Sequence, residues 1–158
     1  MKKTLFRGKR KKNNEWIIGS AIFWESGHIS ITGKSEWLEE TDEKQERKEL
    51  ISVFPETVSE SIGLFDKNGN EIFEGDILAY YSDYQNKEII EGQVKYGNFN
   101  CTCCDGVYGW YIENGDIRFL DSGGICGKIE FYVKGNIWDN PELLKKCDIE
   151  QQKGKQNE

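Results

Sequence analysis

The chain contains a single histidine, His28, and this limits the nucleophilic chemistry that it can perform. A catalytic serine or cysteine needs a base beside it, and His28 is the one imidazole that could serve. His28 follows the turn at residues 25–27 and is expected on the outer face of a hairpin. The sequence contains no Gly-x-Ser-x-Gly elbow, phosphate-binding loop or dinucleotide fingerprint. It therefore predicts that the protein is not an enzyme, with an unrecognised hydrolase as a distant alternative.

The segment Asp66-x-Asn68-x-Asn70 resembles the start of a calcium-binding loop. An EF-hand loop also needs Gly at its sixth position and Glu at its twelfth, where this chain has Glu71 and Ile77. The dipeptide Asn68-Gly69 favours a hairpin turn, because both residues tolerate positive φ. A second turn follows at Gly75 and Asp76. We interpret the residues of the two turns, Asn68, Gly69, Gly75 and Asp76, as structural. We expect neither a metal ion nor a cofactor.

Cysteines crowd one predicted loop, which contains Cys101, Cys103 and Cys104 and is followed later by Cys126. Zinc sites usually combine two pairs of closely spaced cysteines, and no second pair is present. We expect free thiols, although whether these four cysteines bind a metal stays open. The odd total of five cysteines fits a reducing compartment, and no signal peptide or membrane-spanning run is recognisable. The sequence therefore predicts a cytoplasmic protein.

Short apolar runs separated by turns dominate the chain and predict a mostly β protein. Apolar residues make up only 37% of the chain, yet aromatic residues reach 13%, so the core is expected to contain a few large rings. The start at 4–7 looks like an edge strand. Residues 15–24 are predicted to form one strand that is apolar on both faces, with a bulge or close backbone approach at Gly19. From residue 76 onward, about five short strands are typical of an SH3-like β-barrel.

We predict two parts. Residues 1–62 form an N-terminal β-hairpin region with a polar insert at 36–49, and residues 63–146 form the SH3-like barrel. Asn140 and Pro141 are suited to begin a short helix that closes the barrel. The insert contains seven acidic and three basic residues, and whether it is helical or mobile stays open. Residues 147–158 are expected to be a disordered tail.

Binding is the function class that the composition favours. Exposed rings are the candidates for a partner surface, namely Trp16, Phe23, Trp24, Tyr108 and Trp110. Acidic residues outnumber basic ones across residues 76–120, so nucleic acid is an unlikely partner, and a protein partner or a homo-oligomer is favoured. The main rival follows from residues 1–12, which hold seven basic residues and no acidic one. This rival is a nucleic-acid-associated module that uses the basic N-terminus.

Four blocks of the sequence, taken together, carry a family resemblance. They are Phe6-Arg7-Gly8-Lys9 with Trp16 and Gly19-Ser20, Val53-x-Pro55-Glu56-Thr57-Val58, Gly63-Leu64-x-Asp66-Lys67-Asn68-Gly69-x-Glu71-Ile72-x-Glu74-Gly75-Asp76-Ile77, and Gly135-Asn136-Ile137-x-x-Asn140-Pro141-Glu142-Leu143-Leu144. In this order they resemble the YopX family of bacteriophage and prophage proteins. The resemblance implies a mostly β fold with an SH3-like barrel in the C-terminal half, a phage origin and a location in the cytoplasm of a bacterial host cell. It implies no established activity, so the leading hypothesis is a non-catalytic accessory protein that binds a protein partner or itself.

Overall fold

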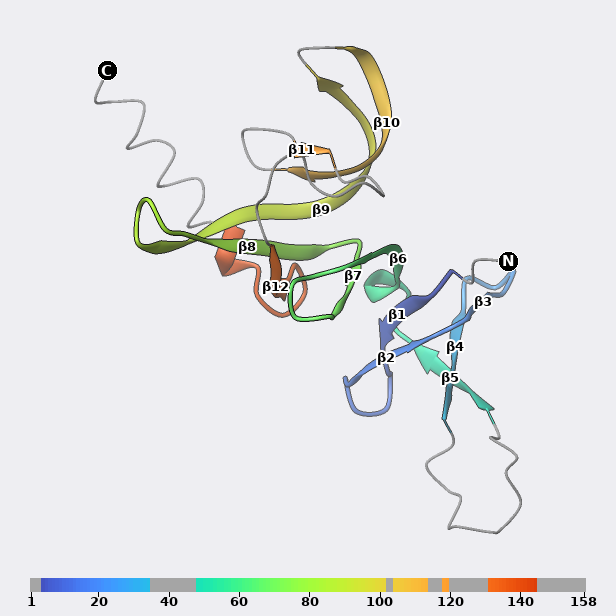
Figure 1. The fold of residues 1–158 in the computed structure, drawn as a ribbon. Helices are drawn as coiled ribbons and strands as arrows, with labels where there is room; N and C mark the ends of the chain where they lie inside the picture. The colour runs from blue at the N-terminus through green and yellow to red at the C-terminus, as the bar shows by residue number, and fades with distance from the viewer. Residues whose placement is uncertain (1–3, 35–47, 102–103, 114–117, 120–130, 145–158) are drawn as a thin grey trace. The chain divides into compact units, whose positions relative to one another are not determined.

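The computed structural model describes residues 4–34, 48–101, 104–113, 118–119 and 131–144. These residues are mostly in β-strands, which confirms the predicted fold class at that level. The chain divides into two compact units, Met1–Ser61 and Ile62–Glu158. Figure 1 labels the strands of both units. The polar stretch 36–47 and the tail 147–158 lie outside the described residues.

Unit 1 is built from six strands and one short 3₁₀ turn. They are β1 Phe6–Lys9, β2 Trp16–Gly19, β3 Ala21–Phe23, β4 Ile29–Lys34, β5 Lys48–Val53, the 3₁₀ turn Pro55–Thr57, and the first residues of β6 Ser59–Phe65. β1 lies between β2 and β6, so the prediction of an edge strand at the N-terminus is wrong. β3, β4 and β5 form a second antiparallel sheet. A bridge between Arg10 and Val53 connects the continuation of β1 to β5.

The predicted single strand 15–24 is instead two strands, β2 and β3, that belong to different sheets. The chain changes sheet at Gly19 and Ser20. Ser20 and Thr32 exchange two hydrogen bonds there: the Ser20 N–H donates to Thr32 Oγ1 at 3.1 Å, and the Thr32 N–H donates to the Ser20 carbonyl at 3.0 Å. A Cβ on Gly19 would overlap the carbonyl oxygen of Thr32. The close backbone approach predicted at Gly19 is therefore confirmed, and it is what allows the change of sheet.

The core of unit 1 is small and aliphatic. Ile17, Ile31 and Val53 are buried at its centre. Partly buried apolar side chains pack around them, namely Phe6, Ala21, Ile29, Ile51 and Val58. The residues of β3, β4 and β5 that alternate with these core positions form the outer face of the sheet, because successive side chains of a strand point to opposite faces.

Unit 2 is a curled, half-barrel sheet of antiparallel strands preceded by a short strand pair. Its elements are the end of β6, then β7 Glu71–Phe73, β8 Asp76–Ser82, β9 Lys87–Cys101, β10 Cys104–Glu113, β11 Arg118–Phe119 and β12 Tyr132–Asn136. The order in the sheet is β11-β10-β9-β8-β12, so the last strand returns beside the first. Residues 142–144 are helical, directly after Pro141. The buried core contains Ile62, Ile72, Leu78, Val94, Ile112 and Phe131.

Two strands of unit 2 depart from simple alternation. Regular alternation over residues 88–96 would place Glu91 on the outer face, but Glu91 is buried. The reason is a bulge, because Leu78 pairs with Gly92 whereas Ala79 pairs with Ile90, which leaves Glu91 as the extra residue. β12 also has a register shift, between Val133 and Gly135.

Candidate functional site

The outer face of β3, β4 and β5 combines exposed apolar side chains with a cluster of polar ones. We call it the Trp24 face, and its members are Ile22, Trp24, His28, Ser30, Leu50 and Ser52. Trp24 remains 48% exposed, although its indole N–H donates to Ser30 Oγ at 3.4 Å. Ser30 is itself buried. The hydrogen bond therefore holds an exposed tryptophan ring against a fixed point of the sheet.

His28 lies within the same cluster. Its Nε2 is 3.1 Å from Ser30 Oγ and 3.2 Å from Ser52 Oγ, so two hydroxyls on neighbouring strands share one ring nitrogen. A serine nucleophile needs a base whose second nitrogen is oriented by another group. Among the described residues, both hydrogen bonds of the imidazole end on Nε2. The arrangement is suited to fixing Trp24 and the sheet surface around it.

Trp16 lies on the outer face of β2 and is half-buried under two cations. The Arg7 guanidinium carbon is 4.9 Å from the centre of the Trp16 ring, and Lys9 Nζ is 5.4 Å from it. Arg7 also donates from Nε to Ser59 Oγ at 3.0 Å and is almost fully buried. Part of the basic N-terminal run thus belongs to strand β1 and packs on an aromatic ring. Residues 1–3 lie outside the described part of the chain.

Phe23 is adjacent to Trp24 in the chain but points to the opposite face of β3. It lies at the rim of the core of unit 1, where its ring meets Phe6 edge-to-face with centroids 5.6 Å apart. More than half of its surface is still exposed. Phe23 and Trp24 are therefore exposed on opposite faces of the sheet.

Tyr108 and Trp110 lie on β10, in the long ribbon that β9 and β10 form together (Figure 1). Trp110 pairs directly with Tyr96 on β9, and the two rings meet at 4.9 Å with an interplanar angle of 62°. Tyr108 is two residues further along the same face and is 71% exposed. We call Tyr96, Tyr108 and Trp110 the ribbon aromatics.

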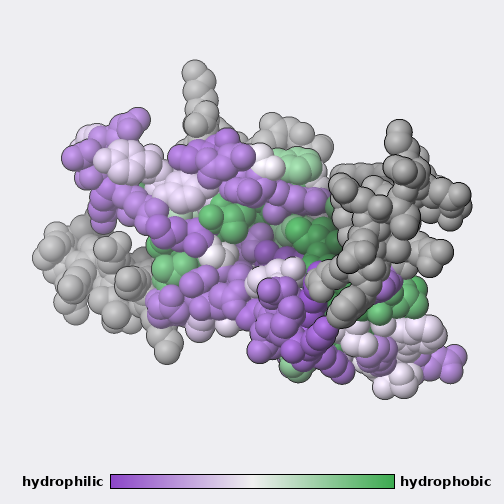
Figure 2. All heavy atoms as spheres, turned by 90° about the horizontal axis from the view of Figure 1, so that it is seen from below, coloured by the Kyte–Doolittle hydropathy of each residue, from purple (hydrophilic) through white to green (hydrophobic). Residues whose placement is uncertain are grey.

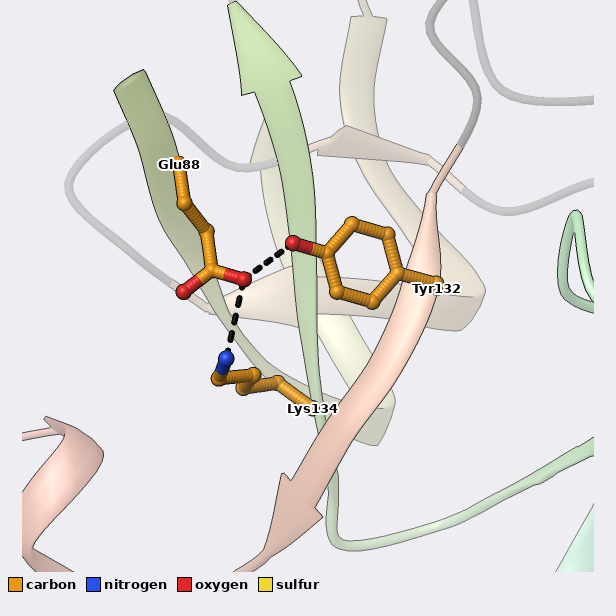
Figure 3. A network of polar contacts seen from close by, with 3 residues as sticks. All are labelled: Glu88, Tyr132 and Lys134. Atoms are coloured by element: carbon orange, nitrogen blue, oxygen red, sulfur yellow. Dashed lines mark hydrogen bonds and ion pairs between the residues drawn. The ribbon is translucent and has the colours of Figure 1, made fainter.

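A polar network joins the two strands on either side of β8 (Figure 3). Tyr132 on β12 donates its hydroxyl hydrogen to Glu88 Oε1 on β9, and Lys134 Nζ donates to the same oxygen at 2.9 Å. Lys67 Nζ lies 4.5 Å from the centre of the Tyr132 ring. The side chains must reach across two strand spacings, roughly 10 Å. β8 leaves room for this contact because the residue paired with Tyr132 is the small Ala79.

The network shifts two pKa values in opposite directions. Partial burial, the hydrogen bond to Glu88 and the carboxylate charge raise the pKa of Tyr132 to about 12. The hydrogen bonds from Tyr132 and Lys134 lower the pKa of Glu88 below its ordinary value. At neutral pH the phenol therefore stays protonated and acts as a hydrogen-bond donor, which stabilises the sheet and leaves no phenolate for chemistry.

Asp66 organises the turn at Asn68 and Gly69. Its Oδ1 accepts from the N–H groups of Asn68 and Asn70, both at 2.8 Å. Its Oδ2 accepts from Asn70 Nδ2 and from the Val133 N–H, both at 3.0 Å. Burial favours the neutral acid, but these hydrogen bonds, led by the one from the Asn70 side chain, lower the pKa of Asp66 overall. The carboxylate oxygens are thus occupied by N–H donors, as a turn requires.

The remaining predicted structural residues lie at turns of the two units. Pro55 opens the 3₁₀ turn of unit 1. Gly75 has φ +81°, and a Cβ there would lie 2.7 Å from the Trp138 ring. Asp76 is fully buried and accepts from the Phe73 N–H at 2.8 Å. The Asn140 side chain packs against Gly135, immediately before Pro141.

No group of three potential metal ligands is found among the described residues. The backbone pairs Cys101 on β9 with Cys104 on β10, but their side chains, like Cys103 and Cys126, lie outside the described part. Within the described ranges, no helix is long and apolar enough to cross a bilayer.

The predicted surface rings belong to both units. Within unit 1, Trp16, Phe23 and Trp24 lie on three different faces, and within unit 2, Tyr108 and Trp110 share a face. Figure 2 shows hydrophobic residues as separate patches among polar ones on the side that it presents. Sequence reasoning missed the polar partners that fix these rings. Alternation places Ser30 on the face of Trp24, but the approach of Ser52 depends on a register that no local signal gives.

Comparison with known proteins supports a family assignment. Residues 5–145 match the family described as YopX protein, which confirms the resemblance seen in the sequence. The crystal structure of protein EF1440 from Enterococcus faecalis is similar to the chain, with 28% sequence identity and a TM-score of 0.51 over 89% of this chain and 97% of that one. No match is found among curated proteins. Because the family match spans most of its length, the chain belongs to the YopX protein family.

Proposed function

We propose that the protein is a non-catalytic accessory protein of a bacteriophage or prophage that binds a protein partner through the Trp24 face. The observation that carries the proposal is an exposed Trp24 whose indole N–H is hydrogen-bonded to buried Ser30. Tryptophan is enriched among the residues that dominate binding energy at interfaces. A ring held in place before binding loses less conformational entropy when a partner covers it.

The neighbours of Trp24 also fit an interface. Ile22 and Leu50 are both exposed on the same face, so apolar contact area extends across the sheet from β3 to β5. His28 and Ser52 supply polar groups beside them. An apolar centre with polar groups at its edge is the usual composition of a protein–protein interface.

Membership of the YopX family is the support for a phage origin, and with it for a location in the cytoplasm of a bacterial host. We further propose an SH3-like architecture. In unit 2, where the sequence predicted the barrel, the support is the curled five-stranded sheet.

The experiment compares the wild type with Trp24→Ala and with Phe23→Ala, a matched control on the opposite face of the same strand. Solution mass is measured first by light scattering at two protein concentrations, and partners are then captured from phage-infected host lysate. We expect a monomer of about 18 kDa, in line with the chain mass of 18.3 kDa, and a partner that Trp24→Ala loses and Phe23→Ala keeps.

An oligomer that Trp24→Ala dissociates would identify self-assembly as the use of this face. Equal capture by wild type and Trp24→Ala would refute the proposal for the Trp24 face. Nucleic-acid binding that disappears when residues 1–12 are deleted would instead support the rival function.

A further inference from the structure

One face of β10 contributes side chains to the core of unit 2. Farther along the ribbon, residues on this same face lie beyond the core. Ile112 pairs with Val94, and both are fully buried. The next pair on this face is Trp110 with Tyr96, which is partly exposed, and the following position is Tyr108, which is largely exposed. The apolar stripe of the core thus ends in three rings that the described residues leave accessible.

The rings are held firmly at their inner end. Trp110 packs against the core cluster and against Tyr96. Tyr108 follows Trp110 at a spacing of two residues, roughly 7 Å along the strand. Stacked or neighbouring aromatic faces concentrate negative electrostatic potential, and this attracts guanidinium and ammonium groups.

The net negative charge of unit 2 also favours a cationic ligand. Residues 62–158 contain 17 acidic and 10 basic residues, a formal net charge of −7 that equals the charge of the whole chain, whereas residues 1–61 hold 11 of each. The lysine nearest to the rings in the sequence, Lys95, is paired with Glu113. A cationic partner is therefore attracted to this unit, while a nucleic acid or a second copy of the unit is repelled.

We propose that the ribbon aromatics bind an extended polypeptide segment that carries arginine or lysine at alternate positions. Side chains that alternate along an extended chain share one face with the same spacing that separates Tyr108 from Trp110. Two cations of the segment then lie over neighbouring rings, and the acidic unit supplies long-range attraction. This surface differs from the Trp24 face, so each proposal can fail without the other.

The test uses the full-length protein and two labelled peptides, one alternating arginine with threonine and the other alternating glutamate with threonine. Fluorescence anisotropy reports binding at low and moderate salt. We expect the arginine peptide alone to bind, with an affinity that falls as salt rises. Tyr108→Ala should weaken it about 3- to 10-fold, because a partly exposed cation–π contact is lost, whereas Tyr108→Phe should keep the affinity.

Trp24→Ala is the control for the other surface and should bind the peptide like the wild type. Tyr108 is so exposed that its replacement by Ala should leave the thermal unfolding midpoint unchanged. Equal binding of the glutamate peptide, or unchanged affinity in Tyr108→Ala, would overturn the proposal. It would also be overturned if Tyr108→Ala abolished either a dimer seen by light scattering or the binding of a labelled single-stranded oligonucleotide.

Discussion

Replacing Asp66 by Asn should destabilise unit 2 strongly, although the side chain keeps its shape. In Asp66→Asn one oxygen remains to accept from the Asn68 and Asn70 N–H groups, but an NH₂ group replaces Oδ2. That NH₂ faces the Val133 N–H, which is a donor as well. Losing a hydrogen bond between a backbone N–H and a carboxylate costs roughly 1.5–3 kcal/mol, and an unsatisfied donor adds to this. We expect a loss of about 2–4 kcal/mol in the free energy of unfolding.

The pH dependence of this difference is a sharper test. Because folding lowers the pKa of Asp66, its contribution to stability is fully present above the ordinary value of 3.8 and is lost as pH falls below it. Chemical denaturation should therefore show a large gap in stability between wild type and Asp66→Asn at neutral pH, and this gap should narrow progressively as the pH is lowered below 3.8. Hydrogen exchange of the Val133 amide should accelerate in the variant at neutral pH.

A matched control is Asp83→Asn, which changes an exposed aspartate in the turn after β8. It should leave the stability at neutral pH near that of the wild type. The reasoning would be refuted by an Asp66→Asn variant as stable as the wild type at neutral pH. A stability gap that stays constant as the pH is lowered would show that the carboxylate charge is not responsible.

Two further predictions concern the fold of unit 2. Gly75→Ala should cost about 2–4 kcal/mol in chemical denaturation, because it combines a left-handed backbone with a clash against the Trp138 ring. Gly69→Ala, with φ +82° and no atom near the added Cβ, should cost only about 1–2 kcal/mol, and equal losses would refute the role of the clash. The raised pKa of Tyr132 means that its contribution to stability is complete below pH 10.0 and is lost as pH rises through about 12. A spectroscopic tyrosine titration should lose its highest-pH component in Tyr132→Phe, and an unchanged curve would contradict the shared hydrogen bond with Glu88.

Patterns among neighbouring residues were enough to predict much of the fold. Ile31 and Val94 stand in stretches where apolar residues alternate with polar ones, and both are fully buried. Gly19 was recognisable as a point of close approach. Such local patterns do not determine which strands pair or in which register they pair. The bulge that buries Glu91 depends on the pairing of β9 with β8, and a shift of one residue in register moves every side chain to the other face.

In the candidate sites, too, the sequence predicted some residues but not the contacts between distant ones. Exposed rings such as Trp24 and Tyr108 could be proposed from composition, and both are exposed in the structure. The groups that position them come from distant parts of the chain. Ser52 is 24 residues from His28, and Tyr132 is 44 residues from Glu88, which it reaches across the strand that carries Ala79. Contacts of this kind follow from the completed sheet and have no signal in the neighbouring sequence.

The hydrogen bond from Val133 to Asp66 also has a consequence for the order of events during synthesis. The two residues are 67 positions apart, and β12 pairs with β8 from the far end of unit 2. A ribosome that has just released β8 must therefore add more than fifty further residues before that strand gains its second neighbour. During this interval the apolar edge of the nascent sheet stays open to chaperones or to wrong partners. Unit 1, whose last pairing is made at residues 59–61, can finish folding first.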